Sequence, residues 1–418
     1  MRPVDRHAAI TAVFIASVLA FWSACVDSDQ SAQAEGTASA GPAEIDSIYL
    51  DPAHVIGLVD GDPEYLFGSI TSAATDTAGR MYVGEGNPPS VRAFDRDGSF
   101  VTWVAREGGG PGEVVQVPAN LIVGVDGRLY VRDARRITVF ASRPGSEIAD
   151  SVVAVWNTLG LGNTTSSRSG LARDGRYFYP GARYLRDALP RFYYSIYTDG
   201  QLEGDTLHVP PYPGLGRISP AIFTLGADGL MLRGLNRVPF SPVPVWDVTP
   251  DGMLVSSDGA SAVLLETDVG GDTVRTIQVP HRLPRPVPAG ELADSLAALE
   301  ERIAAAENMI ARFQGRLSEV VGLGQGVEER RLPDSLPAVI GVNVAQSGSI
   351  WIERWPPEGE HDSRYYDVLD PGGRLQRVVI LRAPLVRDPA PWFGQRSVVG
   401  IIRDPETGVE RIARFDLP

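Results

Sequence analysis

A short unit that joins a glycine-containing turn to an apolar strand recurs along most of the chain, and this repeat constrains the fold more than any other feature. The glycines of its six copies are Gly79, Gly127, Gly175, Gly252, Gly348 and Gly394. Three of the five intervals between them are 48, 48 and 46 residues, and the other two are longer, at 77 and 96 residues. A fixed period of this length is typical of repeat architectures, in which each unit packs against the next.

Each of the first five units also carries a second turn, which follows a strand that ends in an apolar or aromatic residue. These second turns contain Asp97-Gly98, Pro144-Gly145, Asp199-Gly200, Gly270-Gly271 and Gly372-Gly373. Asp-Gly and Gly-Gly supply the positive φ angles that tight hairpins require. We therefore predict that each unit is a four-stranded antiparallel meander, strands A to D, with short turns joining A to B and C to D. Four strands in about 40–50 residues are typical of one blade of a β-propeller.

The two ends of the chain are predicted to complete one blade between them. The last unit has only three candidate strands, the third at 411–415, whereas the segment 54–59 precedes the first complete unit. We expect 54–59 to be the outer strand of the last blade, because this pairing leaves no open seam in the ring. The predicted fold is all-β: a six-bladed β-propeller over residues 44–418, closed by an N-terminal strand in the last blade and carrying one long helical insertion.

The segments IGLVDGDPEYLFG, TAGRMYV, VRAFDRDGSF and REGGGPGEV between Ile56 and Glu113, together with the DPGGR hairpin at 370–374, support a family resemblance. They resemble the six-bladed propellers of bacterial secreted and lipid-anchored proteins in the TolB-like and NHL-repeat group. The resemblance covers nearly the whole chain from residue 50. It implies architecture rather than chemistry, because the group includes protein-binding modules as well as sugar and peptide enzymes.

The two long intervals contain insertions, at about 209–244 and about 281–338. Both follow the fourth strand of one unit and precede the first strand of the next. In a propeller these connections open on the same face as the B-to-C loops, so both insertions are expected at one face, the mouth where ligands usually bind. The first insertion is rich in proline and contains a predicted hairpin around Asp228-Gly229. Alternatively, this hairpin belongs to a seventh, irregular blade.

The second insertion contains one predicted helix over 289–319. An a/d stripe runs along it: Leu292, Leu296, Leu299, Ile303, Ala306, Ile310, Phe313 and Leu317. Such a stripe either packs on the rim of the propeller as a lid or makes a coiled-coil contact with a second copy or another protein. Membrane attachment through this helix is disfavoured, because its acidic residues outnumber its arginines.

The first 24 residues are predicted to be a secretory signal peptide. Arg2 and Arg6 precede an apolar run at 8–22, which is shorter than the roughly 20 residues that a membrane-spanning helix needs. Small residues before Cys25 resemble the lipobox of bacterial lipoproteins, which implies that this cysteine is lipidated. An A-x-A match at 32–34 is the competing cleavage site. Residues 25–43 then form the lipidated cysteine and a flexible Ser/Ala/Gly-rich tether with too little apolar surface to fold.

The lipoprotein resemblance also implies a location. We expect an exported protein that is held to the bacterial envelope by its lipid anchor alone, at the outer membrane or in the periplasm. Val26, rather than Asp, follows Cys25, and this favours the outer membrane.

Composition excludes several chemistries. All 38 basic residues are Arg, and the absence of Lys excludes Schiff-base lysines, Walker-A phosphate loops and protein kinases. A single Cys permits no intrachain disulfide and no Cys-rich zinc or iron–sulfur site. The net charge of −14 at pH 7 argues against nucleic acid as a partner, because binding a polyanion requires clustered cations.

The candidate binding residues follow the second strand of several units, where side chains would point toward the mouth. They are Glu85, Arg132, Asp133, Asp258, Glu353 and Arg354. Converging carboxylates could hold Ca²⁺ or act as acid and base. The alternative is structural, since an Asp at this position commonly bonds to the backbone of a neighbouring blade. The four histidines beyond the leader show no metal-ligand spacing, so we predict no cofactor, with Ca²⁺ as the alternative.

Two functions follow from these observations. The favoured one is a non-catalytic binding module that holds a protein, peptide or glycan at the channel mouth, at the cell envelope. The alternative is an extracytoplasmic hydrolase or lyase, assisted by Ca²⁺, with Asp133, Asp258 and Glu353 as its carboxylates.

Overall fold

The computed structural model describes residues 46–133, 136–158, 168–183, 191–210, 219–225, 230–236, 239–279, 284–298, 301, 317–321 and 333–418. The chain divides into a segment Met1–Glu44 and a compact unit Ile45–Pro418. The predicted signal peptide, Cys25 and the tether therefore lie outside the described residues. Among the described residues, no helix has the length and apolar character needed to cross a bilayer.

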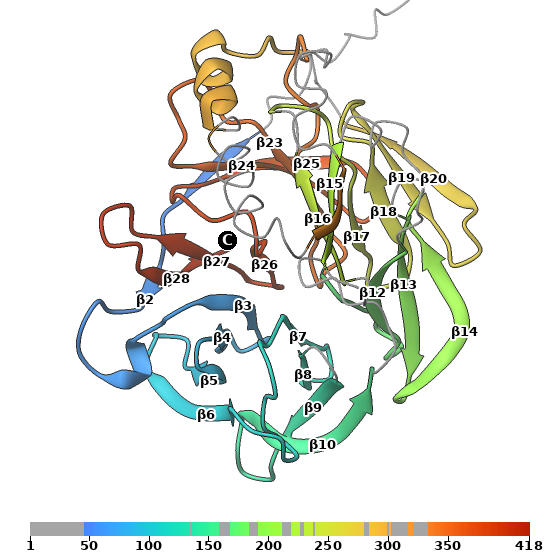
Figure 1. The fold of residues 1–418 in the computed structure, drawn as a ribbon. Helices are drawn as coiled ribbons and strands as arrows, with labels where there is room; N and C mark the ends of the chain where they lie inside the picture. The colour runs from blue at the N-terminus through green and yellow to red at the C-terminus, as the bar shows by residue number, and fades with distance from the viewer. Residues whose placement is uncertain are drawn as a thin grey trace, which may run out of the picture. The chain divides into compact units, whose positions relative to one another are not determined.

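The compact unit is a six-bladed β-propeller, as predicted (Figure 1). Blade 1 contains β3 (Ile70–Thr75), β4 (Met81–Gly86), β5 (Pro89–Phe94) and β6 (Phe100–Arg106). Blade 2 contains β7 (Asn120–Val123), β8 (Leu129–Arg132), β9 (Arg136–Ser142) and β10 (Ala149–Asn157). Blade 3 contains β11 (Gly170–Leu171), β12 (Tyr177–Arg183), β13 (Arg191–Thr198) and β14 (Gln201–His208).

The second half of the ring follows the same antiparallel order. Blade 4 contains β17 (Val245–Val248), β18 (Leu254–Ser257), β19 (Val263–Thr267) and β20 (Thr273–Gln278). Blade 5 contains β22 (Gly341–Val344), β23 (Ile350–Arg354), β24 (Arg364–Leu369) and β25 (Leu375–Leu381). Blade 6 contains β26 (Trp392–Phe393), β27 (Ser397–Arg403) and β28 (Glu410–Asp416), and its fourth strand is β2 (His54–Ile56).

The turns that defined the repeat have the backbone geometry their sequences require. Gly79 joins A to B in blade 1 with φ of +89°, and Gly98 joins C to D with φ of +87°. L-residues with a Cβ atom rarely adopt these angles, so glycine allows the tight turns.

The predicted closure of the ring is confirmed. Strand β2 pairs antiparallel with β28, with Val55 opposite Ala413 and Ile56 opposite Ile412. The pairing is shorter than the 54–59 expected, because Gly57 follows with φ of +132° and turns the chain away from the strand.

A further strand precedes this closure and was not predicted. Strand β1 (Ser47–Leu50) runs parallel to β25 as a fifth, outermost strand of blade 5. Its four residues are too few to show strand alternation in the sequence, and the edge of β25 supplies the pairing. The N-terminal segment therefore covers the outer edges of two neighbouring blades, through β1 on blade 5 and β2 on blade 6.

The apolar core is distributed between the blades. Six clusters of buried side chains each combine residues of two neighbouring blades, including the pair formed by blades 6 and 1. In the blade 6–blade 1 cluster, Ile56 packs with Met81 and Ile401, all at most 3% exposed. Each blade therefore buries both of its faces only when the ring is complete.

The two insertions meet in one small sheet. In the first, β15 (Ser219–Leu225) and β16 (Leu230–Asn236) form the expected hairpin. In the second, β21 (Leu317–Val321) pairs antiparallel with β15. This three-stranded sheet draws strands from both insertions, so it is not a seventh unit of the repeat.

The predicted helix 289–319 is correct at its beginning and wrong at its end. Residues 289–298 and 301 are helical, whereas Leu317–Val321 is a strand. The edge of β15 and the β-branched pair Val320 and Val321 favour extended backbone there, and this tertiary pairing overrides the helical periodicity. Leu292 and Leu296 of the stripe are half-buried. Leu299 and the part of the stripe at 302–316 lie outside the described residues, and the coiled-coil contact stays a prediction. The part of the chain that the structure describes also has a 3₁₀ turn, η1 (Pro63–Tyr65).

Because β2 closes the ring, we predict that substitutions of its buried side chain lower the free energy of unfolding. The Ile56→Ala variant should lower the free energy of unfolding by about 2–4 kcal/mol, because a side chain 3% exposed is removed from the core between blades 6 and 1. The measurement is denaturant unfolding. The control is Val55→Ala on the same strand, whose side chain is 47% exposed and whose loss should change stability by less than about 0.5 kcal/mol. Equal effects of the two substitutions would show that the strand does not close the core.

Candidate functional site

A cavity of about 610 Å³ lies at the face of the propeller where the A strands begin. Its walls come from the starts of β3 and β7, the connections that precede them, and the connection from blade 5 to blade 6. The described residues that line it are Ser69–Ala73, Val117, Ala119–Leu121, Arg168, Val245, Arg387–Ala390, Trp392, Arg403 and Glu410. Because both insertions also connect a D strand to an A strand, this is the face that the sequence predicted as the mouth. We call this space the mouth cavity.

Arg168 crosses the channel below the mouth cavity. It precedes β11 of blade 3, and its Nη1 donates to Oδ1 of Asn343 in blade 5 at 3.0 Å. Its Nη2 donates to the carbonyl oxygens of Ala390 and Pro391, just before blade 6. The same guanidinium lies 3.6 Å from the Asp247 carboxylate in blade 4. One side chain therefore connects four blades.

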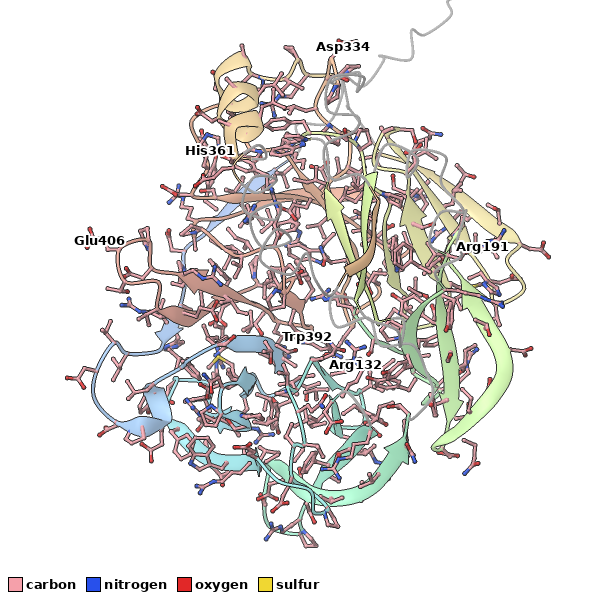
Figure 2. The ribbon with its side chains drawn as sticks, in the orientation of Figure 1. Arg132, Arg191, Asp334, His361, Trp392 and Glu406 are labelled. Carbon is pink, nitrogen blue, oxygen red and sulfur yellow. The ribbon has the colours of Figure 1, made fainter. Side chains whose placement is uncertain are left out.

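On the other side of Arg168 the space is small. A cavity of about 60 Å³ is lined by the ends of the A strands, including Val123, Leu171, Val248 and Phe393, and by Arg168 itself. This volume has room for a few water molecules and not for an organic ligand. The mouth cavity therefore ends at Arg168, and Figure 2 places Trp392, which lines both cavities, near the middle of the ring of blades.

Asp247 and Arg168 each influence the pKa of the other. Burial raises the pKa of the Asp247 carboxyl above its usual value, and the Arg168 charge opposes that rise. Burial also lowers the pKa of Arg168, against the attraction of Asp247. The carboxylate is held further by the backbone N–H of Val344, at 2.8 Å from Oδ2, and by the N–H of Val248, at 2.9 Å from Oδ1.

Other polar side chains join neighbouring A strands around the channel. Ser72 Oγ accepts from the N–H of Leu121 at 2.9 Å, which joins blades 1 and 2. Asn120 Oδ1 accepts from the N–H of Ser169 at 3.2 Å, which joins blades 2 and 3. Gln346 of blade 5 donates across the channel to the carbonyl oxygen of Val123. The first two contacts border the mouth cavity, whereas Gln346 and Val123 line the small cavity on the other side of Arg168.

Two arginines in the lining of the mouth cavity are partly exposed, and a glutamate holds one edge of each guanidinium group. The Nε of Arg387 donates to Glu353 at 3.1 Å, and its side chain is 42% exposed. Arg403 donates through Nε and Nη2 to Glu410, and its side chain is 57% exposed. Glu410 is in turn fixed by the N–H of Ile70 at 2.7 Å. The anchored edges orient two cationic groups in the lining of the cavity.

Three of the sequence candidates come from blades 1 and 2, and each makes buried contacts. Glu85 pairs with Arg92 and accepts the N–H of Gly68 at 2.6 Å, and burial raises its pKa. Arg132 is 1% exposed and lies over the Tyr179 ring of blade 3, with 5.4 Å from its Cζ to the ring centroid. Asp133 accepts the N–H of Val115 and of Arg136.

The other three candidates lie in blades 4 and 5. Asp258 accepts from the N–H groups of Ala260 and Ser261 and from the Ser261 hydroxyl, in a local turn. Glu353 is 6% exposed and is shared by Arg364 and Arg387. Arg354 pairs with Asp367 at 3.5 Å. The six candidates therefore do not gather around one point, and each has a structural partner. Of the six, Arg354 lines a described cavity, one beside the mouth. A ligand role for them stays a prediction.

Sequence reasoning missed the residues that line the channel. Asp247 is a charged residue inside the otherwise apolar strand 245–248, and that pattern was a usable signal. Arg168 carried no such signal, because its partners are 79, 175, 222 and 223 residues away in the chain. Among the described residues, no group of three His, Cys, Asp or Glu side chains is placed to hold a metal ion. Figure 2 shows His361 beside the helical insertion, away from the channel.

Three solved structures are similar to this chain at low sequence identity, each with a TM-score below 0.5. Neither a family model nor a curated protein matches the chain. A solved structure described as a "Putative exported protein" from Bacteroides fragilis has 9% identity and a TM-score of 0.45, covering 89% of this chain and 99% of that one. A member of the DUF4221 family from Bacteroides vulgatus has 10% identity and a TM-score of 0.42, covering 88% and 97%. Virginiamycin B lyase from Staphylococcus aureus has 10% identity and a TM-score of 0.37, covering 87% and 99%. These similarities carry no information on the activity of this chain.

The Arg168–Asp247 pair makes a prediction about stability. Arg168→Met should lower the free energy of unfolding by about 3 kcal/mol at pH 7, because it leaves Asp247 buried without its counter-charge. The loss should shrink at acidic pH. A carboxyl whose pKa is raised by folding binds its proton more tightly in the folded state, so stability is lost as pH rises from the unfolded pKa through the folded one. Denaturant unfolding at several pH values measures both effects.

Two controls accompany this prediction. Adding Asp247→Asn to Arg168→Met should recover much of the loss at pH 7, because the uncompensated charge is gone. Arg173→Met removes a surface pair between the same two blades, Arg173–Asp251, and should cost less than about 1 kcal/mol. A pH-independent loss in Arg168→Met would mean that packing, rather than charge, explains the effect.

Proposed function

We propose that this protein is a binding propeller of the bacterial envelope, which holds a protein, peptide or glycan in its mouth cavity. The observation that carries the proposal is a cavity of about 610 Å³ that ends on a fixed floor at Arg168. This volume is within the range of known ligand sites, about 300–1,000 Å³. The partly exposed Arg387 and Arg403 offer donors to acceptor groups of a ligand.

The hydrogen bonding of the carboxylates supports binding over catalysis. A general acid or base must be able to exchange a proton with the substrate. Glu410 and Asp247 each accept a backbone N–H and face an arginine. Asp133, Asp258 and Glu353, the carboxylates of the hydrolase or lyase alternative, are on three different blades and are engaged in comparable contacts.

The mouth cavity is tested by a matched pair of variants. Val117→Trp adds an indole to the mouth cavity, and Val125→Trp adds one at the opposite end of the channel; the two valines are 43% and 51% exposed. The protein is screened on arrays of cell-wall glycans and peptides. We expect ligands whose affinity falls about tenfold or more in Val117→Trp and stays unchanged in Val125→Trp. Equal binding by both variants, or turnover of a bound ligand, would contradict the proposal.

The envelope location is proposed from Cys25. Expressed in a Gram-negative host, the chain should incorporate labelled palmitate and partition into detergent, because lipidation of Cys25 provides the anchor. The Cys25→Ser variant should do neither. Mass measurement of the mature N-terminus decides the processing site, and cleavage after Ala34 with no lipid would contradict the lipoprotein assignment.

A further inference from the structure

A second cavity, of about 430 Å³, lies beside the mouth between blades 4 and 5. We call it the side cavity. Four segments surround it: the B-to-C loop of blade 4, the outgoing and returning arms of the second insertion, and the end of strand B with the start of strand C in blade 5. The described residues that line it are Ala260, Ala262, Pro284, Arg285, Ser335–Ala338, Arg354, Trp355, Pro357 and Tyr365.

The arms of the insertion are docked on blade 5 by main-chain contacts. The N–H of Leu336 donates to the carbonyl oxygen of Arg285 at 2.8 Å, which joins the outgoing and returning arms. Nη1 of Arg285 donates to the carbonyl oxygens of Trp355 and Pro356, at 3.2 and 3.1 Å. These contacts fix the described walls of the side cavity relative to blade 5.

Its walls combine proline and alanine surfaces with two aromatic rings. The Trp355 ring is held by Phe240, with centroids 5.2 Å apart, and by the Arg387 guanidinium, 5.0 Å from its centroid. Tyr365 is 6% exposed, and its hydroxyl donates to Glu360. A fixed aromatic wall favours a flat or apolar ligand body.

The polar side chains that line the side cavity are mostly donors. Arg285 has no carboxylate partner among the described residues, and its Nη1 bonds are to carbonyl oxygens. Arg354 uses Nη1 toward Asp367, at 3.5 Å, and is 32% exposed. The buried indole N–H of Trp355 has no hydrogen-bond partner among the described residues. No carboxylate belongs to the described lining. Arg354 is paired with Asp367 but its side chain stays 32% exposed, so Arg285 and Arg354 both offer guanidinium donors to a ligand in the side cavity.

We propose that the side cavity binds an organic carboxylate with an aromatic or apolar body. The body packs between the proline surfaces and Trp355, and the carboxylate accepts from Arg285 and Arg354, since guanidinium groups match carboxylate geometry. Arg387 lines the mouth cavity and stacks on Trp355 in the wall of the side cavity, so the two cavities are neighbours. The inference rests on the proposed function, because it describes one part of the ligand that the mouth would hold: an apolar or aromatic body that carries a carboxylate.

The test uses the full chain and two pairs of probes. Phenylacetate and its neutral isostere phenylacetamide test the chemistry, and acetyl-alanyl-phenylalanine with a free or amidated carboxyl group tests whether a peptide C-terminus supplies it. Binding is measured by ligand-observed NMR and by quenching of Trp fluorescence. We expect phenylacetate to bind in the millimolar range, at least about tenfold more tightly than phenylacetamide, because the charge-assisted hydrogen bonds are lost in the amide.

Variants locate the binding. Arg285→Gln and Arg354→Gln should each weaken phenylacetate binding severalfold, and the double variant about tenfold or more. Arg374→Gln, an exposed arginine in the C-to-D turn of the same blade, should have no effect. Because Arg285 also docks the insertion, its variant is compared with wild type by thermal unfolding, and Arg354→Gln gives the independent readout.

The outcomes separate this inference from the proposed function. Val117→Trp should leave phenylacetate binding unchanged, since Val117 lines the mouth cavity and not the side cavity. The inference is overturned if acid and amide bind equally, if neither saturates at millimolar concentration, or if both arginine variants bind as wild type does. Each of these results leaves the Val117→Trp and Val125→Trp comparison of the mouth cavity intact.

Discussion

The packing of each blade against its two neighbours is the constraint on which the rest of this structure depends. Six clusters of buried apolar side chains lie between neighbouring blades, so each blade shares its core with its neighbours. Hydrophobic burial of this kind is satisfied only by closing the ring. Closure comes from β2, because a strand from the start of the chain completes the last blade and joins its two ends in one sheet.

Closure also creates the channel and decides its chemistry. When six blades meet, their A strands converge and bring together polar groups that are far apart in the sequence. Arg168 and Asp247 are a clear case, since a buried carboxylate requires a partner and the partner comes from the adjacent blade. The same arginine bonds to blade 5 and to the connection before blade 6, which fixes the floor of the mouth cavity. The rigidity of the proposed binding site is thus a consequence of the fold.

The insertions add the features that distinguish this ring from a plain propeller. Both enter at the mouth face, and β15 of the first pairs with β21 of the second. The arms of the second also form part of the side cavity with Trp355 and Arg285. In propellers the scaffold is provided by the repeat and specificity by connections of this kind, so the proposed ligand chemistry rests on them.

The architecture could be predicted from the sequence because its signals are local. Glycine turns such as Gly79 and Gly98 define hairpins within a few residues, and their regular spacing predicts six blades and the closing strand. Strand β21 shows where local signals fail, because helical periodicity through Leu317 gave way to an available strand edge. The same holds for β1, whose pairing depends on the edge of β25.

The residues of the candidate site could be predicted from the sequence less well than the fold, because they come together only in the tertiary structure. The sequence predicted that both insertions lie at the mouth face, where the structure has a cavity, but the charged residues it selected, such as Glu85 and Glu353, are in structural contacts on separate blades. Periodicity locates strands and turns, whereas the meeting of Arg168 with Asp247 and Asn343 depends on how far each blade is rotated around the axis. The sequence by itself determined the blades and their order, through turn chemistry and repeat length. Only the closed ring decided which side chains share the channel, because their proximity is a property of packing between blades and not of any one segment.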